Sequence, residues 1–196
     1  ATLHPDRFAG LVDWVGPSGD ALNGTPLAGQ SAPNDGYVGN PLEMLENLRH
    51  VPAAMLYAGE DELVHVNNGV ALEQRLAELG YEHVLWFHPV AEHLTFALLD
   101  DWRKEAAWSA GRRRTVDPSH VVYRVDRTID SPNPALGLVY DHAYWVRDIA
   151  YRTQGDTLVD ARSFGCAGRT EDATAADPAG AGTDPVPWVS QSWSKV

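Results

Sequence analysis

The first half of the chain alternates apolar runs of strand length with stretches in which apolar residues recur at helical spacing. Each run is apolar almost throughout, which is typical of strands buried on both faces of a parallel sheet. The runs cover residues 8–15, 51–58 and 83–88, and the helical stretches cover residues 40–48, 67–79 and 94–107. Strands and helices that alternate in this order predict an α/β fold, with a parallel sheet and crossover helices.

Local signals agree with these helices. Asn40 can cap the first of them, and Gly80 is a typical stop for the second. Leu94, Leu98 and Trp102 form one stripe on the third, as on an amphipathic helix. Residues 16–40 are rich in Gly, Pro, Ser, Asn and Asp and show no period, which predicts a long functional loop.

The second half changes to alternation of apolar and polar residues, the period of antiparallel strands with one wet face. This alternation occurs at residues 120–127, 143–152 and 157–163. Because a basic linker precedes it at 112–115, we expect residues 1–111 to form the α/β unit. Residues 116–196 are then expected to form a small β-sandwich-like unit packed beside it, without adding strands to its sheet.

The pattern also assigns the two sides of this second unit. The wet face is expected to carry Arg124, Asp126, Arg147 and Asp148, and the dry side to carry Val122, Val125 and Trp145. Residues 167–187 offer little apolar surface to offset chain entropy, so we expect them to be the least ordered segment. Residues 188–193 alternate again, which is compatible with a last strand.

Composition excludes several classes of function. The net charge of −12 argues against nucleic-acid binding, because an acidic surface repels phosphates. No apolar stretch reaches the ~20 residues of a membrane helix. Cys166 is the only cysteine, which excludes an internal disulfide or a cysteine zinc cluster. His83 and His88 point to opposite faces of a strand, so no metal site or cofactor is expected. Two lysines against thirteen arginines are compatible with a secreted protein.

Two residues that follow predicted strands carry the candidate chemistry. Asp61 comes just after the second apolar run and His93 just after the third, 32 residues later. Because the carboxyl ends of parallel strands form the active-site crevice of an α/β sheet, we expect these side chains to lie within reach of each other. Glu60, Glu62 and Glu92 are neighbours that could supply the acid instead, although charged loop residues usually face water.

The same residues resemble a known family. Residues 59–65 read Gly-Glu-Asp-Glu-Leu-Val-His, residues 89–93 read Pro-Val-Ala-Glu-His, and residues 4–10 read His-Pro-Asp-Arg-Phe-Ala-Gly. In this order the motifs resemble the α/β-hydrolase fold, specifically its prolyl-oligopeptidase-like serine hydrolases. The resemblance covers about the first 110 residues and implies the C-terminal half of the hydrolase sheet. It also implies Asp61 as the acid and His93 as the base of a Ser-Asp-His triad.

The nucleophile of such a triad is missing from the sequence. No Gly-x-Ser-x-Gly occurs, and Ser18 in Gly-Pro-Ser-Gly follows a strand but opens a loop rather than a helix. We therefore expect the nucleophile and the oxyanion hole on sequence before Ala1, either upstream or on a companion chain. The chain begins without Met, which agrees with a piece of a longer protein or one chain of a processed pair.

Two further interpretations stay open. Trp14 ends the first strand and is a candidate wall of the substrate pocket or a plain core residue. The whole chain is either part of an ester or peptide hydrolase or a non-catalytic α/β-hydrolase-like module that binds or scaffolds through its β unit. A complete small β-rich binding protein is a third and weaker reading.

Overall fold

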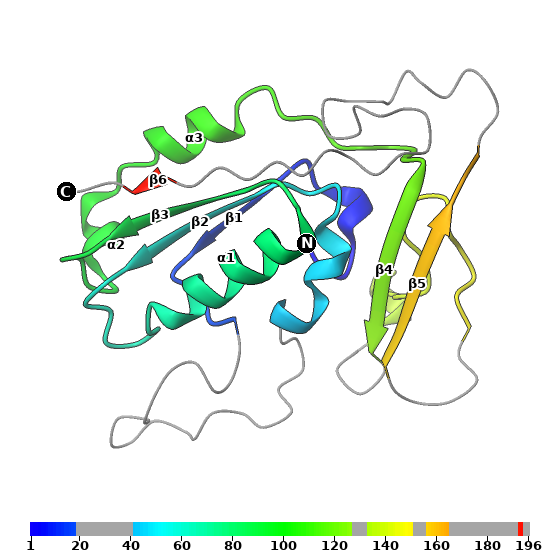
Figure 1. Cartoon of the computed structure of the whole chain (residues 1–196), viewed down its shortest axis with the longest axis horizontal. Coiled ribbons are helices and arrows are strands. Elements are labelled where there is room, and N and C mark those ends of the chain that lie inside the picture. Colours follow the sequence, from blue (N-terminus) through cyan, green and yellow to red (C-terminus); the bar gives the residue numbers. More distant parts are fainter. Residues whose placement is uncertain (19–40, 127–132, 151–155, 165–191, 194–196) are drawn as a thin grey trace.

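The computed structural model shows a parallel sheet covered by helices on both faces, with a two-stranded unit at one end (Figure 1). It describes residues 1–18, 41–126, 133–150, 156–164 and 192–193. The segment 167–187 and all but the first three residues of the expected functional loop at 16–40 lie outside these residues.

Three parallel strands form the body of the larger sheet. They are β1 (Leu11–Trp14), β2 (Ala53–Ala58) and β3 (His83–His88), and they lie in the order of the sequence. Leu11 pairs with Ala53, and Ala53 pairs with His83, so all three strands end at the same edge. The predicted α/β class and the parallel sheet are therefore confirmed.

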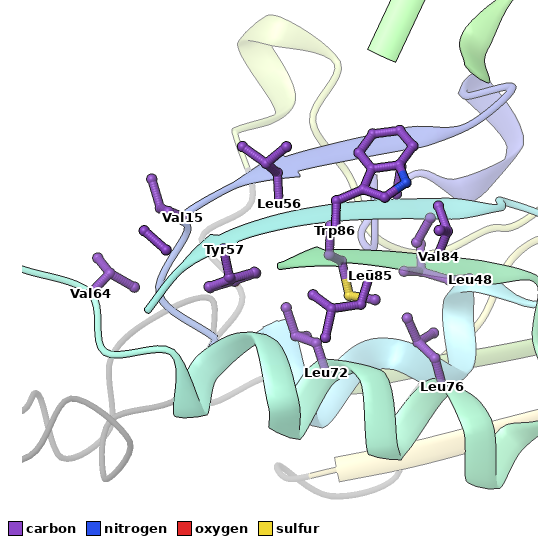
Figure 2. Close-up of a cluster of buried hydrophobic side chains, with 14 of the residues drawn as sticks. Val15, Leu48, Leu56, Tyr57, Val64, Leu72, Leu76, Val84, Leu85 and Trp86 are labelled. Atoms are coloured by element: carbon purple, nitrogen blue, oxygen red, sulfur yellow. The ribbon is translucent and has the colours of Figure 1, made fainter. Parts of the chain in front are cut away.

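Apolar packing on both faces of β2 explains its unbroken apolar sequence. All of its residues are buried. Figure 2 shows Tyr57 pointing toward α1 (Asn67–Leu79), from which Leu72 and Leu76 point back at the sheet. Leu56 and Trp86 lie on the opposite face. Burial of such side chains is the main source of stability for this unit.

The helix α1 has the predicted bounds. It ends where Gly80 adopts φ 69°, and the Gly80 amide donates to the carbonyls of Ala77 and Leu76. The predicted helix at 40–48 is a 3₁₀ helix, η3 (Pro41–Leu48), whose last five residues are buried. A shorter 3₁₀ turn, η1 (Pro5–Arg7), precedes β1.

The third predicted helix is broken in two. The structure has α2 (Thr95–Leu99) and α3 (Arg103–Ser109), separated at Asp100, which has φ 45°. Phe96 is the only buried residue of α2, whereas Leu98 and Trp102 are exposed. The single amphipathic helix expected here is therefore wrong, because it is broken at Asp100 and its apolar stripe of Leu94, Leu98 and Trp102 is exposed rather than packed against the sheet.

The second unit contains one antiparallel pair, β4 (His120–Asp126) and β5 (Asp156–Arg162). It forms its own sheet, as expected, but the described residues show no second sheet stacked on it, so the sandwich is not observed. The third predicted strand, at 143–152, is wrong over its described part. Ala143 and Val146 instead pair across a tight turn in which Tyr144 has φ 54°. A short 3₁₀ turn, η4 (Pro134–Leu136), precedes it.

The chain returns to the first sheet at its end. The two-residue strand β6 (Ser192–Trp193) pairs parallel with β3. The expectation that nothing after residue 116 would join the α/β sheet is therefore wrong at this point, although the alternation at 188–193 had indicated a last strand.

The two sides of β4 differ from the expectation. Val121, Tyr123 and Val125 face one cluster with Ala143 and Tyr144, and Val122 is also buried, but on the opposite side. Residues an odd number apart on a strand point to opposite faces, so Val122 and Val125 cannot share one dry side.

The remaining side assignments have mixed outcomes. Arg147 and Asp148 are exposed, as expected, and Trp145 is half-buried, with its indole donating to Pro118 O at 2.6 Å. Arg124 is half-buried and lies 3.6 Å from Glu46. The side chain of Asp126 lies outside the described residues.

A buried asparagine joins the two units. The side-chain amide of Asn47 on η3 donates to the Arg124 carbonyl at 2.8 Å and accepts from the Arg124 amide at 2.5 Å. It also donates to the carbonyl of Thr2 at 2.8 Å. The Asn47 side chain thus makes the hydrogen bonds that a neighbouring strand would make to the edge of β4. These bonds hold the second unit against the first.

Candidate active site

The loops that follow β2 and β3 run side by side at the edge where the strands end. The Gly59 amide donates to His88 O at 2.8 Å, and the Glu60 amide donates to Ala91 O at 3.0 Å. A Cβ atom on Gly59 would collide with the carbonyl oxygen of Pro89. Glycine at this position therefore allows the two backbones to approach closely enough to bring the following side chains together.

Asp61 and His93 form a hydrogen-bonded pair at this edge. Nδ1 of His93 lies 2.9 Å from Oδ2 and 3.2 Å from Oδ1 of Asp61. The expected proximity of the two residues is confirmed. Neither Glu60, Glu62 nor Glu92 bonds to His93, and all three side chains are exposed, so the acid partner of the imidazole is Asp61.

The Asp61 carboxylate is fixed before any ligand arrives. Its side chain has no exposed surface, and Oδ1 accepts the amides of Leu63 at 2.9 Å and Val64 at 2.6 Å. Charge-assisted bonds of this kind offset much of the cost of burying a carboxylate. Asp61 can therefore act as a rigid, preoriented acceptor for the histidine.

The histidine is bound on one side only. Because an ionised carboxylate can only accept, the proton of a neutral His93 ring resides on Nδ1, and Nε2 carries the lone pair. Within the described residues, Nε2 has no hydrogen-bond partner, and the side chain is 24% exposed. The arrangement leaves a basic nitrogen available for a proton from a hydroxyl group.

A second polar pair lies nearby and was missed by the sequence analysis. Oη of Tyr57 lies 2.6 Å from Oδ2 of Asp13 and also 2.6 Å from the carbonyl oxygen of Gly16. Burial, followed by the charge of Asp13, raises the pKa of Tyr57, so the hydroxyl keeps its proton. The only signal in the sequence was the interruption of an apolar run by Asp13.

This pair supports the position of α1. Gly69 of that helix lies against the ring of Tyr57, so closely that a Cβ atom would overlap the ring. Burial raises the pKa of Asp13, and the Tyr57 hydroxyl counteracts part of that shift. The pair therefore fixes the first turn of α1 against the end of β2, the strand that Asp61 follows.

Trp14 contacts α2 and α3 rather than the Asp61–His93 pair. Its ring stacks on Trp102 with centroids 3.6 Å apart and lies 5.7 Å from Phe96. Its indole nitrogen donates to Glu105 at 3.5 Å. Trp102 in turn lines an open depression of about 620 Å³ on the surface. Trp14 is thus the inner layer of an aromatic stack, and no contact in the described residues makes it a wall beside His93.

Ser18 is bound to α1. It is fully buried, and its hydroxyl donates to Asn68 O at 3.0 Å, while its amide donates to Asn68 Oδ1 at 2.8 Å. This explains the serine as a structural anchor for the start of α1. As expected for a serine that opens a loop rather than a helix, its hydroxyl makes no hydrogen bond to His93.

Two other described histidines bond to an aspartate at 2.8 Å, His120 to Asp160 and His142 to Asp141, but neither pair lies at the carboxyl edge of the parallel sheet. The described residues contain no group of three or more histidine, cysteine or acidic side chains placed to hold a metal ion. No described helix is long and apolar enough to cross a membrane.

No protein-family model, no curated protein and no solved structure matches the chain. The class of protein therefore rests on the fold and the site alone. These define an α/β protein in which a buried aspartate orients a histidine at the carboxyl edge of a parallel sheet.

Proposed function

We propose that this chain supplies the acid and the base of a serine hydrolase, which cleaves an ester or peptide bond by acyl transfer. The observation that carries the proposal is the bond between Asp61 and His93 at the strand ends. In this role Nε2 of His93 removes the proton of a serine hydroxyl and later delivers it to the leaving group. Asp61 holds the ring in the required tautomer and stabilises the imidazolium that forms.

The serine belongs, in this proposal, to an upstream segment or a companion chain. Two features of the described residues support this. The first is the free Nε2 of His93, and the second is the edge of the sheet at β1. All four residues of β1 are half-buried, whereas those of β2 are fully buried. Within the described residues β1 pairs only with β2, so its other edge can accept a parallel strand that brings the nucleophile.

The test is complementation. The chain alone should not hydrolyse a p-nitrophenyl ester, and adding the segment encoded before Ala1, or the companion chain, should produce turnover. That segment should carry Gly-x-Ser-x-Gly at a turn between a strand and a helix. Turnover by the chain alone that disappears in Ser18→Ala would reverse the assignment of the nucleophile.

A non-catalytic binding or scaffold module is the second candidate. It is favoured by one observation, that Ser18, the serine of the motif nearest to the nucleophile turn, is buried and bonded to Asn68. Under this alternative the second unit is the interacting part. An upstream segment or companion chain without a serine at a strand–helix turn would decide for it.

A further inference from the structure

Large apolar side chains are exposed on both sides of His93 in the sequence, from Val90 to Trp102. Val90, Leu94, Leu98, Leu99 and Trp102 are between 47% and 83% exposed, and we call them the α2 surface. The Leu98 amide donates to Leu94 O at 3.0 Å, which places these two leucines one turn apart on the same side. Contiguous exposed apolar groups of this kind usually mark a binding site.

The α2 surface lies beside the candidate active site. The helix begins two residues after His93, at the end of the sheet toward which the arrowheads of β2 and β3 point (Figure 1). Beyond it, Leu99 and Trp102 line the open depression of about 620 Å³. Trp102 is held in place there by stacking on Trp14 and by donating to Asp100 at 2.7 Å. An extended ligand could therefore contact this depression and reach His93.

The charged residues around this surface are of both signs, but Arg103, which lines the depression, is paired with Asp101 at 2.6 Å, and Lys104 lies over the ring of Trp86. Glu60, Glu62 and Glu92 are exposed, and within the described residues their carboxylates have neither an ion pair nor a hydrogen bond. Some carboxylates elsewhere are paired with arginines, as Glu82 is with Arg112 at 2.8 Å. The negative charge beside Asp61 and His93 is therefore left for something outside the described residues to neutralise.

We propose that the α2 surface and the three glutamates bind a cationic peptide rich in aliphatic side chains. Carboxylates attract its lysine or arginine side chains, and the leucines and Trp102 bury its aliphatic ones. The same negative charge disfavours anionic lipid surfaces and nucleic acids. If the proposed hydrolase function holds, on which this last step rests, such a peptide is the substrate presented to His93.

Binding can be measured on the chain of 196 residues without its nucleophile. A hexapeptide that alternates leucine and lysine is titrated against the chain, with tryptophan fluorescence as the readout. Its affinity should exceed that of a leucine–glutamate hexapeptide and that of a serine–lysine hexapeptide by about tenfold or more. High salt should weaken the binding, because the glutamates are exposed and their charge is screened.

Matched variants assign the contacts. Replacing Glu60, Glu62 and Glu92 together by glutamine should weaken the leucine–lysine peptide about tenfold and remove most of its salt dependence. Leu94→Ser with Leu98→Ser should weaken it about tenfold as well. The controls are Glu43→Gln, an exposed glutamate on η3, and Leu136→Ser, a leucine on η4 that is 72% exposed. Neither should change the affinity.

Several results would overturn the proposal. These are equal affinity for the leucine–lysine and leucine–glutamate peptides, affinity unchanged in both groups of variants, and no saturable binding at all. Binding to phosphatidylserine vesicles but not to the peptide would assign the surface to a membrane. Self-association abolished by Leu98→Ser would assign it to a second copy of the chain. None of these results depends on turnover, so the proposed hydrolase function would remain to be judged by complementation alone.

Discussion

Nδ1 of His93 lies 2.9 Å from Oδ2 of Asp61, although 32 residues separate them in the chain. The loop from each strand end is short, and the two loops are bonded to each other through their backbones. The pair is therefore set by the sheet rather than by a flexible loop. Its geometry exists before any substrate binds, as expected of a preorganised site.

The first prediction concerns the acid. In the assembled enzyme, Asp61→Asn should lower kcat by about four orders of magnitude, because the asparagine side chain allows the wrong imidazole tautomer. Folding should be kept, since the new Oδ1 can still accept the amides of Leu63 and Val64. Steady-state kinetics and circular dichroism measure the two effects.

Glu60→Gln and Glu62→Gln test the alternative acids with a neutral p-nitrophenyl ester, which has no cation for these glutamates to bind; kcat should stay within a few-fold of the wild type, because only Asp61 bonds to His93. The opposite pattern, with a neutral Asp61→Asn and a severe loss in either glutamate variant, would mean that the acid lies one residue away. His93→Ala should remove activity at least as strongly as Asp61→Asn, because the serine loses its base.

The second prediction concerns the glycine that brings the loops together. Gly59→Ala should lower the free energy of unfolding by about 1–3 kcal/mol, because the new methyl group overlaps the backbone of Pro89. Gly10→Ala is the control, since its methyl group would meet the ring of Trp108 at 3.3 Å and a side chain can shift. Urea denaturation compares the two variants. If Gly59→Ala lowers the free energy of unfolding no more than Gly10→Ala does, the close approach of the two loops contributes little to stability.

The third prediction concerns the joint between the two units. Asn47→Ala should lower the free energy of unfolding by about 2–4 kcal/mol, because it leaves backbone groups of Arg124 and Thr2 buried without partners. Asn67→Ala, at an exposed position on α1, should cost little. Hydrogen exchange should show lost protection at residue 124. Protection equal to that of the wild type would mean that the units are held by apolar contacts alone.

The α/β half of the fold could be predicted because its signals are local. The apolar runs at 51–58 and 83–88 and the helix ended by Gly80 follow from period and capping alone. The break at Asp100 could not be predicted, because Leu94, Leu98 and Trp102 keep helical spacing across it. A stripe of this kind predicts a helix whether its apolar side faces a core or the surface.

The second half was predicted less well, for a related reason. The alternation at 143–152 was interpreted as a strand, but Tyr144 adopts a positive φ and Ala143 pairs with Val146 across a turn. Tyrosine has no local preference for such a turn, so only tertiary packing determines it. Val122 is likewise buried on the side of β4 away from Val121 and Val125, and the bonds from Asn47 to the edge of β4 have no sequence signal.

The candidate site, too, could be predicted from the sequence only in part. Asp61 and His93 could be placed together from strand ends and spacing, since parallel strands end at one edge. The contact of Asp13 with Tyr57 could not, because it depends on the register between β1 and β2 and on which face each residue takes. A charged residue in an apolar run indicates a buried partner but does not identify it.

The final prediction uses that contact. Burial raises the pKa of Asp13 above its usual value of 3.8. In the folded protein the carboxyl group therefore holds its proton more tightly than in the unfolded chain. The stability that it contributes is fully present below pH 3.8 and is lost as the pH rises through the folded-state pKa.

Asp13→Asn exposes this effect, because asparagine does not titrate and can still accept the Tyr57 hydroxyl. The free energy of unfolding of the wild type minus that of Asp13→Asn should be largest at acid pH. Above pH 3.8, the usual pKa of aspartate, this difference in the free energy of unfolding should fall by up to about 1.4 kcal/mol per pH unit. It should level off above the folded-state pKa of Asp13. In a Tyr57→Phe background the fall should extend to higher pH, because the hydroxyl that counteracts the raised pKa is gone. Urea denaturation of the four proteins, namely the wild type, the two single variants and the double variant, between about pH 4 and pH 8 measures both differences. A difference that rises with pH would mean that Tyr57 holds Asp13 as a carboxylate, with a lowered pKa.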